Sequence, residues 1–132
     1  MQTKAVNPWT WQDAYGFSQA VESSGATRLL VCSGQTSVDA DGNPLHSGDM
    51  AAQLGQALDN LEAVLRAAGL GFADVVRLNY YTTDVAAYLA ASGEVGRRFA
   101  GTGRSPPAGT LLGVAALFHP DVMIEIEATA IA

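Results

Sequence analysis

The chain has 132 residues, of which 48% are hydrophobic and 15% are charged, a composition typical of a folded protein with one core. Thirteen acidic residues against seven basic ones give a formal net charge of −6. This argues against nucleic acid as a main partner, because such binding depends on basic groups that neutralise phosphates. No apolar run approaches the ~20 residues that span a bilayer, and the first residues lack the apolar stretch of a signal peptide. We therefore expect a single domain covering residues 1–132, in the cytoplasm, with no membrane partner.

The N-terminal part contains two short candidate strands, residues 17–21 and 28–34. The linker between them, residues 22–27, is rich in Ser and Gly and has the composition of a hairpin turn. We therefore predict that these two strands form a β-hairpin.

A long amphipathic helix is predicted to begin after Asp49, which is a good N-cap. Apolar residues recur in steps of three and four from Met50 to Ala68, which places them on one stripe of the helix. Gly69 stands where a C-terminal glycine is typical. The spacing thus predicts one helix that covers a sheet.

A third strand, residues 75–83, is rich in β-branched and aromatic residues, and Asp84 then caps a second helix that runs to about Ala100. The alternation of the strand places two sets of side chains on opposite faces: Val76, Leu78, Tyr80 and Thr82 on one face, and Val75, Arg77, Asn79, Tyr81 and Thr83 on the other. The expected inner face of the second helix holds Val85, Tyr88, Leu89, Val95 and Phe99.

The chain closes with two predicted strands, residues 109–117 and 123–131, around a turn at 119–121. The order β-β-α-β-α-β-β predicts an α+β fold with both helices on one face of a mixed sheet. The other face carries a mixed set of side chains, which is typical of contact with another subunit or a ligand. A closed homo-oligomer is the simplest way to cover it.

The motif Ile124-Glu125-Ile126-Glu127 places two carboxylates on one strand face and two isoleucines on the other. A carboxylate in this setting can position a water or move a proton, and it can equally make a salt bridge across an interface. Both interpretations stay open from the residues alone. Ser33-Gly34 ends a strand, where a hydroxyl beside an approachable backbone suits a cleft or, equally, a turn.

Several other kinds of site find no support in the sequence. Cys32 is the only cysteine and lies in an apolar run, where burial as a small hydrophobe is expected. His46 and His119 stand apart in turn-like contexts, so no metal site is expected. The phosphate loop G-x-x-x-x-G-K-[ST] and the nucleophile elbow G-x-S-x-G are both missing. We expect no metal and no cofactor.

Taken together, the short motifs resemble the YjgF-type Rid family, the reactive-intermediate (enamine/imine) deaminases. The matching stretches are Ser18–Val21, Ser33–Gln35, Gly48-Asp49 with Gln53, Ala57–Leu61, Ala67–Gly69, Asp74–Val76, Thr83-Asp84, Pro107-Ala108, Val114 and Ile124–Ala128. The resemblance covers nearly the whole chain from about residue 15. It implies a chorismate-mutase-like fold, a homotrimer, and pockets for a small-molecule ligand in the clefts between subunits.

The resemblance also implies a set of site residues. Glu125 matches the catalytic, water-positioning carboxylate, and Ser33 matches a ligand-binding serine. Phe17, Gly109, Thr110 and Leu111 match ligand-binding positions. Three of these depart from the family pattern, which often has tyrosine at Phe17, arginine at Gly109 and cysteine at Leu111.

The change at Gly109 affects the expected activity most. The arginine that usually follows the Pro-Ala pair holds the carboxylate of a 2-imino acid through a bidentate, charge-assisted pair. Without it, a ligand carboxylate loses hydrogen bonds that are each worth about 1.5–3 kcal/mol. The classical 2-imino acid activity is therefore expected to be weak or absent, unless Arg104, five residues earlier in the chain, takes over the role.

Three functions follow from the resemblance. The first is a hydrolase-like protein that acts on an enamine or imine other than a simple 2-imino acid. The second is a non-catalytic trimer that binds a metabolite or a partner protein. The third, a ribonuclease or translation inhibitor, is disfavoured because the chain is acidic and has no basic stripe.

Overall fold

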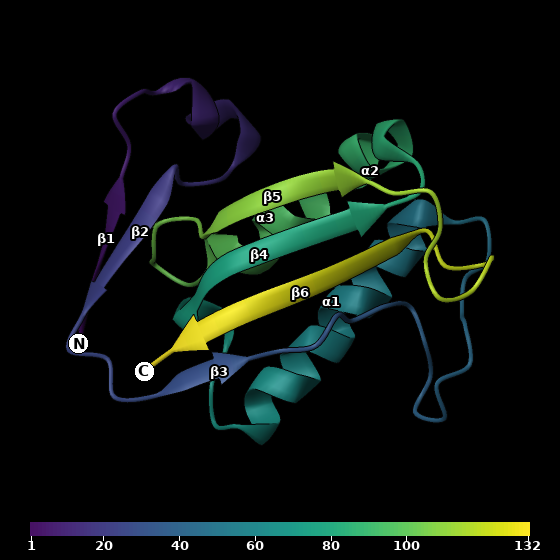
Figure 1. Cartoon of the computed structure of the whole chain (residues 1–132), viewed down its shortest axis with the longest axis horizontal. Coiled ribbons are helices and arrows are strands. Elements are labelled where there is room, and N and C mark those ends of the chain that lie inside the picture. The colour runs from purple at the N-terminus through teal and green to yellow at the C-terminus, as the bar shows by residue number, and fades with distance from the viewer.

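The computed structural model describes residues 1–132 as an α+β fold (Figure 1). In chain order the elements are β1 (Gln2–Val6), η1 (Trp11–Tyr15), β2 (Ala20–Ser24), β3 (Leu29–Val31), α1 (Met50–Ala67), η2 (Phe72–Asp74), β4 (Val75–Thr82), α2 (Val85–Ala91), α3 (Gly93–Ala100), β5 (Ala108–Gly113) and β6 (Ile124–Ile131). No helix has the length and apolarity needed to cross a membrane.

The main sheet has four strands in the order β3-β6-β4-β5, in which β4 and β5 are parallel and the other pairs are antiparallel. Figure 1 shows all three α-helices behind this sheet, so that its other face is uncovered in one chain. We call this uncovered side the open face. The predicted arrangement, with helices on one face of a mixed sheet, is confirmed.

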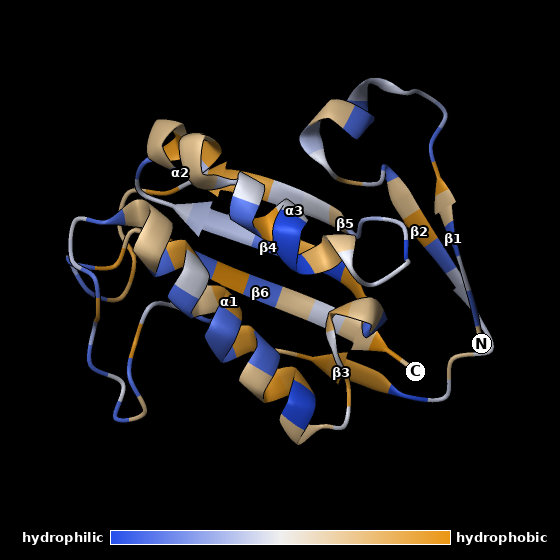
Figure 2. Cartoon of the chain, turned by 180° about the vertical axis from the view of Figure 1, so that it is seen from behind, coloured by the Kyte–Doolittle hydropathy of each residue, from blue (hydrophilic) through white to orange (hydrophobic).

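The core lies between α1 and the sheet (Figure 2). Four leucines at the predicted helical spacing are fully buried: Leu54, Leu58, Leu61 and Leu65. They face the alternate residues of β6, beginning with Ile124 and Ile126, which are also fully buried. Asp49 caps α1 as predicted, because its side chain accepts a hydrogen bond of 3.0 Å from the Ala52 backbone.

The predicted hairpin between residues 17–21 and 28–34 is wrong. Strand β2 pairs instead with β1, a strand that the sequence interpretation missed, and the two form a separate sheet. Strand β3 pairs with β6. Local turn composition at residues 22–27 marked a change of direction correctly, but the choice of strand partner is set by long-range packing.

The second predicted helix is divided at Ser92 into α2 and α3, the second of which begins at Gly93. The Ser92 hydroxyl bonds back to the Leu89 carbonyl at 2.8 Å, and such a local bond competes with helix continuation. Tyr88 is buried as expected, but Val85 and Leu89 are exposed. The short α2 lies at the end of the sheet, so only one side of it meets the core.

A register irregularity between Val75 and Arg77 changes the predicted faces of β4. Val75 was expected on the open face but is buried in the core. Beyond this bulge the alternation holds: Leu78 and Thr82 are buried, whereas Arg77 and Tyr81 lie on the open face. A bulge shifts every earlier side chain to the opposite face.

The loop before β6 is anchored by the buried side chain of Gln53 on α1. Its Nε2 donates hydrogen bonds to the backbone oxygens of His46 and Asp121, at 3.1 and 2.7 Å. Its Oε1 accepts a bond of 2.8 Å from the Met123 backbone N–H. One side chain thus fixes the point at which β6 begins.

Candidate functional site

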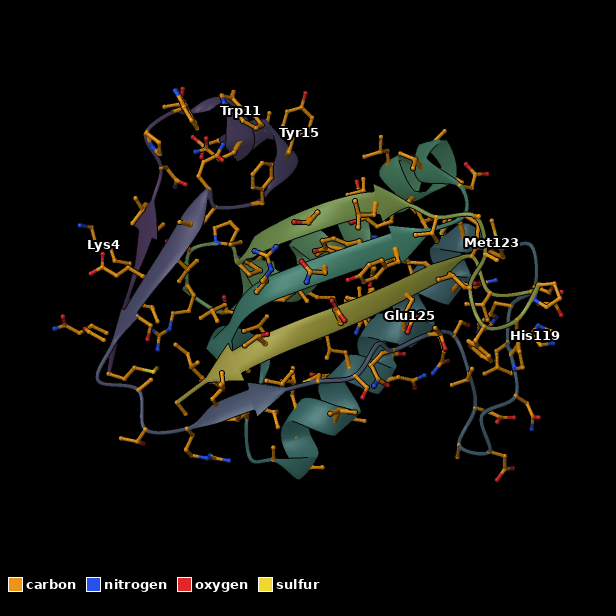
Figure 3. All side chains as sticks on the ribbon, viewed as in Figure 1. Lys4, Trp11, Tyr15, His119, Met123 and Glu125 are labelled. Carbon is orange, nitrogen blue, oxygen red and sulfur yellow. The ribbon has the colours of Figure 1, made fainter.

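Glu125 lies on the open face near the start of β6 (Figure 3). Its neighbours Ile124 and Ile126 point into the core and are fully buried, so strand alternation directs the Glu125 carboxylate outward. Tyr81 of β4 stands directly opposite Glu125 in the register. The predicted catalytic carboxylate therefore lies over the sheet, at the surface that the helices leave uncovered.

A β-bulge beside β3 sets the surroundings of Glu125. Val31 pairs with Thr129, and Gln35 pairs with Ile126. Between these two pairs, one side of the ladder has four residue steps and the antiparallel β6 has three. The extra residue falls at Ser33-Gly34, and Gln35 and Ile126 exchange backbone hydrogen bonds of 2.7 and 2.9 Å just after it. Bulges of this kind re-aim side chains next to functional sites.

Gly34 lies directly under the Glu125 side chain. A Cβ at position 34 would come within 1.9 Å of Glu125 Oε1 and 2.7 Å of its Cγ, distances that no real contact allows. Only glycine therefore lets the Glu125 side chain lie flat over this backbone. Ser33 is exposed beside it, so the structure brings these two predicted site residues to the same part of the open face.

Glu127 is the centre of a hydrogen-bonded cluster on the same face. Its Oε1 accepts bonds of 2.5 Å from the Tyr81 hydroxyl and 3.0 Å from Asn79 Nδ2. These two bonds lower the pKa of Glu127, in that order of importance, and the same contact raises the pKa of Tyr81. Glu127 is thus held as a carboxylate, whereas Glu125 makes no ion pair within the chain.

Thr110 also lies on the open face, on the outer strand β5. Its hydroxyl accepts a hydrogen bond of 2.9 Å from Arg77, and its register partner is Asn79. Because β6, β4 and β5 are successive neighbours, Thr110 is separated from Glu125 by β4. The hydroxyl is therefore close to the Glu127 cluster rather than to Glu125.

The other predicted residues lie on the opposite side of the sheet. Leu111 packs against the core beneath the helices. Phe17 and Gly109 line a pocket of about 170 Å³ beside strand β5, between η1, α3 and the segment 104–109. We call this the Arg104 pocket. Its apolar wall includes Tyr80, Val95 and Phe99, and Arg104 is its one charged lining residue.

Ser18 positions the neighbouring segments of this pocket, a role that the sequence interpretation missed. Its side chain is almost fully buried. Its hydroxyl donates a bond of 2.5 Å to the Pro106 carbonyl, and its backbone N–H donates to the Pro107 carbonyl at 3.2 Å. The available signal in the sequence was the Pro106-Pro107 pair. Proline has no backbone N–H to donate, but its carbonyl still accepts a hydrogen bond, and here both carbonyls accept one from Ser18.

Gly109 occupies a place where no side chain fits. A Cβ there would lie 2.3 Å from the Leu78 carbonyl oxygen, which belongs to the backbone of the neighbouring strand. Close approach of β5 to β4 therefore requires glycine. An arginine at this position would require the β5 backbone to move away from β4. The observed pairing of β5 with β4 is therefore compatible only with glycine at position 109.

The predicted site residues thus form two groups separated by the sheet. Ser33, Glu125 and Thr110 lie on the open face, whereas Phe17, Gly109 and Leu111 lie on the helix side or at the β5 edge. No group of three or more His, Cys, Asp or Glu side chains is placed to hold a metal ion.

The fold and site define a class of small α+β proteins with helices on one sheet face and a carboxylate on the other. The family model described as Endoribonuclease L-PSP matches residues 11–132. The chain belongs to this family, which includes the YjgF and Rid proteins.

Individual relatives agree with this assignment. Protein DfrA of Myxococcus xanthus is 35% identical over 132 residues, which cover 99% of this chain and 97% of DfrA. The 2-iminobutanoate/2-iminopropanoate deaminase of Escherichia coli K12 is 33% identical over 103 residues, 78% of this chain and 79% of the deaminase. The Rid-family protein YyfB of Yersinia pestis has a crystal structure that matches with a TM-score of 0.88 at 39% identity, covering both chains completely.

Proposed function

We propose that this Rid-family protein hydrolyses an enamine or imine other than a simple 2-imino acid. The observation that carries the proposal is the Glu125 carboxylate, which lies over Gly34 beside the exposed Ser33 on the uncovered sheet face. The relationship to a deaminase of 2-imino acids supports the reaction type. The Gly109 backbone leaves no room for a carboxylate-binding side chain, which argues against the simplest substrates.

In the proposed mechanism, Glu125 accepts a proton from a water molecule as the water oxygen attacks the imine carbon. A C–O bond forms and the C=N bond becomes single. Glu125 returns this proton to the nitrogen, which gives a neutral carbinolamine. Glu125 then accepts the hydroxyl proton and passes it to the nitrogen as the C–N bond breaks, so that ammonia leaves and the carbonyl product forms. Ser33 donates a hydrogen bond to the ligand. General acid–base catalysis of this kind typically contributes about 10²–10⁴-fold.

The site is proposed to lie between subunits of a homotrimer. The two groups of residues face opposite sides of one sheet, so one chain cannot bring them onto a single small ligand. A cyclic, head-to-tail assembly would place the open face of one copy against the β5 edge of the next. Such an assembly would also cover Leu29 and Val31, which are 69% and 71% exposed in one chain.

A substrate panel tests the reaction. Imines are generated from small, branched and aromatic amines by a flavin amine oxidase, and from the matching amino acids by an amino acid oxidase, and ammonia release is followed with and without the protein. We expect acceleration for the imines that lack a carboxylate, which is lost in Glu125→Gln and kept in the control Glu62→Gln, a partly exposed residue of α1. Turnover of 2-aminoacrylate as fast as by the Escherichia coli deaminase would contradict the proposed substrate range.

Mixed assemblies test the location of the site. One variant, Glu125→Gln, has an intact β5 edge, and a second, Gly96→Leu, has an obstructed Arg104 pocket and an intact carboxylate. Refolding an equal mixture should restore about a quarter of the wild-type activity. In each shared site the carboxylate is intact with a probability of about one half, and the β5 edge of the neighbouring chain is intact with the same probability. No recovery would contradict a site shared between copies.

A non-catalytic, metabolite-binding or partner-binding trimer is the second candidate function. It is favoured by Gly109, since the backbone contact with Leu78 excludes the clamp at that position. A ligand-dependent rise in melting temperature that survives Glu125→Ala, together with no turnover across the imine panel, would support this alternative.

A further inference from the structure

We propose that the Arg104 pocket takes a single uncharged aromatic ring, and that imines of arylalkylamines are therefore the substrate class of this protein. The inference rests on the proposed function, because it names the part of the substrate that does not react. It also assigns a role to Gly96 of α3, which leaves the room for the ring and so determines specificity.

The interior of the pocket favours an uncharged group. Although Arg104 lines the pocket, its Nη1 donates a hydrogen bond of 3.1 Å to the Thr3 hydroxyl. Thr3 lines a separate hollow of about 210 Å³ beside β1, so the guanidinium is held outside the Arg104 pocket. A carboxylate that moved from water into this pocket would lose its hydration without gaining a charged partner.

The size of the pocket matches one aromatic ring. Its volume is about 170 Å³, and an apolar cavity of about 150 Å³ is large enough to bind one benzene molecule. A methyl or ethyl group would leave most of this space without contacts. Because removal of apolar surface from water drives binding to such a pocket, a phenyl group is the substituent that gains most there.

The aromatic walls of the pocket are held in place by rings outside it. Each of the three aromatic residues that line the pocket packs against a second ring that does not line it. The pairs are Phe17 with Trp11, Phe99 with Phe72 and Tyr80 with Tyr88, with ring centroids 5.6, 5.0 and 5.3 Å apart. Edge-on and tilted pairs of this kind favour fixed ring orientations. A ligand ring therefore meets walls that are already formed.

The room for a ring depends on small residues of α3. Gly96 and Ala100 lie one turn apart on this helix, and both line the pocket. Glycine is a poor helix former compared with alanine or leucine. Neither a positive φ nor a close approach of another segment requires it at position 96, since a Cβ there would meet nothing within 4 Å. The absent side chain of Gly96 therefore serves to keep the pocket open.

Fluorine NMR titration tests the ring site without turnover. The probes 4-fluorobenzyl alcohol and 4-fluorobenzoate have nearly the same shape and differ in charge. We expect the alcohol to bind the wild-type protein about tenfold more tightly than the acid, or better. Gly96→Leu should weaken binding of the alcohol by about tenfold or more, because leucine fills the space of the ring. The matched control is Gly55→Leu on α1, where a Cβ also meets nothing within 4 Å and which lies outside the pocket.

The smaller substitution Gly96→Ala separates binding from folding. Alanine is the better helix former, so this variant should have a higher urea midpoint than the wild type and still bind 4-fluorobenzyl alcohol more weakly. A change in opposite directions cannot come from loss of structure.

Turnover tests the substrate class. The imines that a flavin amine oxidase forms from 2-phenylethylamine and from ethylamine differ by one phenyl group. Gly96→Leu should lower kcat/KM for the first imine by about tenfold or more and leave kcat/KM for the second within about threefold of the wild-type value.

Three results would overturn the inference: binding of 4-fluorobenzoate as tight as that of the alcohol, no binding of the alcohol, or equal binding of the alcohol by the wild type and Gly96→Leu. Equal loss of kcat/KM for both imines in Gly96→Leu would overturn the role of Gly96 in specificity. Binding of the alcohol by a protein that hydrolyses no imine would support the ring site and contradict the proposed function alone.

Discussion

The open face and the Arg104 pocket differ in almost every physical property, although they lie on the two sides of one sheet. The open face is polar and carries Glu125 and the bonded carboxylate of Glu127, whereas the pocket is apolar and has Arg104 as its one charged lining residue. In the proposed function, proton transfer belongs to the open face and the apolar pocket lies apart from it on other elements of the sheet, so that one region can change without the other.

The largest expected effect concerns the open face. Glu125→Gln removes the proposed proton acceptor and should lower the hydrolysis rate by about 100-fold or more. The free energy of unfolding should stay within about 1 kcal/mol of the wild-type value, because Glu125 makes no ion pair within the chain. A rate close to that of the wild type would remove Glu125 from the proposed mechanism.

A smaller loss of rate is expected from Gly34→Ala. The added Cβ would overlap Glu125 Oε1, so the carboxylate must leave its position over the bulge. Because misplacement of a catalytic group by about 1 Å can cost up to about 10²-fold, we expect a rate loss of about 10-fold or more. Gly55→Ala on α1, where a Cβ meets nothing within 4 Å, is the matched control. A wild-type rate in Gly34→Ala would show that Gly34 does not determine the position of the Glu125 carboxylate.

On the pocket side, the corresponding glycine is expected to affect stability rather than chemistry. Gly109→Ala places a Cβ 2.3 Å from the Leu78 carbonyl oxygen, a contact that only a backbone shift relieves. Overpacking of this kind typically costs about 1–3 kcal/mol of unfolding free energy. Urea denaturation of the wild type, Gly109→Ala and Gly55→Ala measures the difference, and a stable Gly109→Ala would show that β5 can move away from β4.

The smallest effect concerns pH and the Glu127 cluster. The bonds from Tyr81 and Asn79 lower the pKa of Glu127 below its ordinary 4.5. Its stabilising contribution is therefore complete above pH 4.5 and is lost as the pH falls through the lowered pKa. Glu127→Gln should be less stable than the wild type near neutral pH, and the gap should narrow in acid. Urea denaturation midpoints of both proteins across this pH range measure the difference in stability. A difference that does not change with pH would contradict the lowered pKa of Glu127.

Local features of the fold were predictable from the sequence because they depend on neighbouring residues. Asp49 and Asp84 cap helices as expected, since each side chain bonds to a backbone N–H three residues ahead. The alternation in residues 124–127 placed Glu125 on the open face for the same reason. The order of the predicted strands and helices placed the helices on one face of a mixed sheet, and the resemblance to the family implied the same fold.

The remaining features depend on contacts between distant segments. The pairing of β2 with β1, the bulge at Ser33-Gly34 and the register shift after Val75 are all choices between strands that local composition does not determine. The separation of the candidate site into two groups also follows from this. Gly109 and Thr110 are adjacent in sequence, yet they face opposite sides of β5, so adjacency did not predict a shared site.

Gln53 has a consequence for how this scaffold can vary. Its amide contacts only backbone groups of His46, Asp121 and Met123, so the position of the loop before β6 does not depend on which side chains that loop carries. Residues 114–121 can therefore exchange their side chains while the strand register that places Glu125 stays the same. Substitutions in this loop are therefore expected to leave the Glu125 carboxylate in place, because one buried glutamine holds the start of β6.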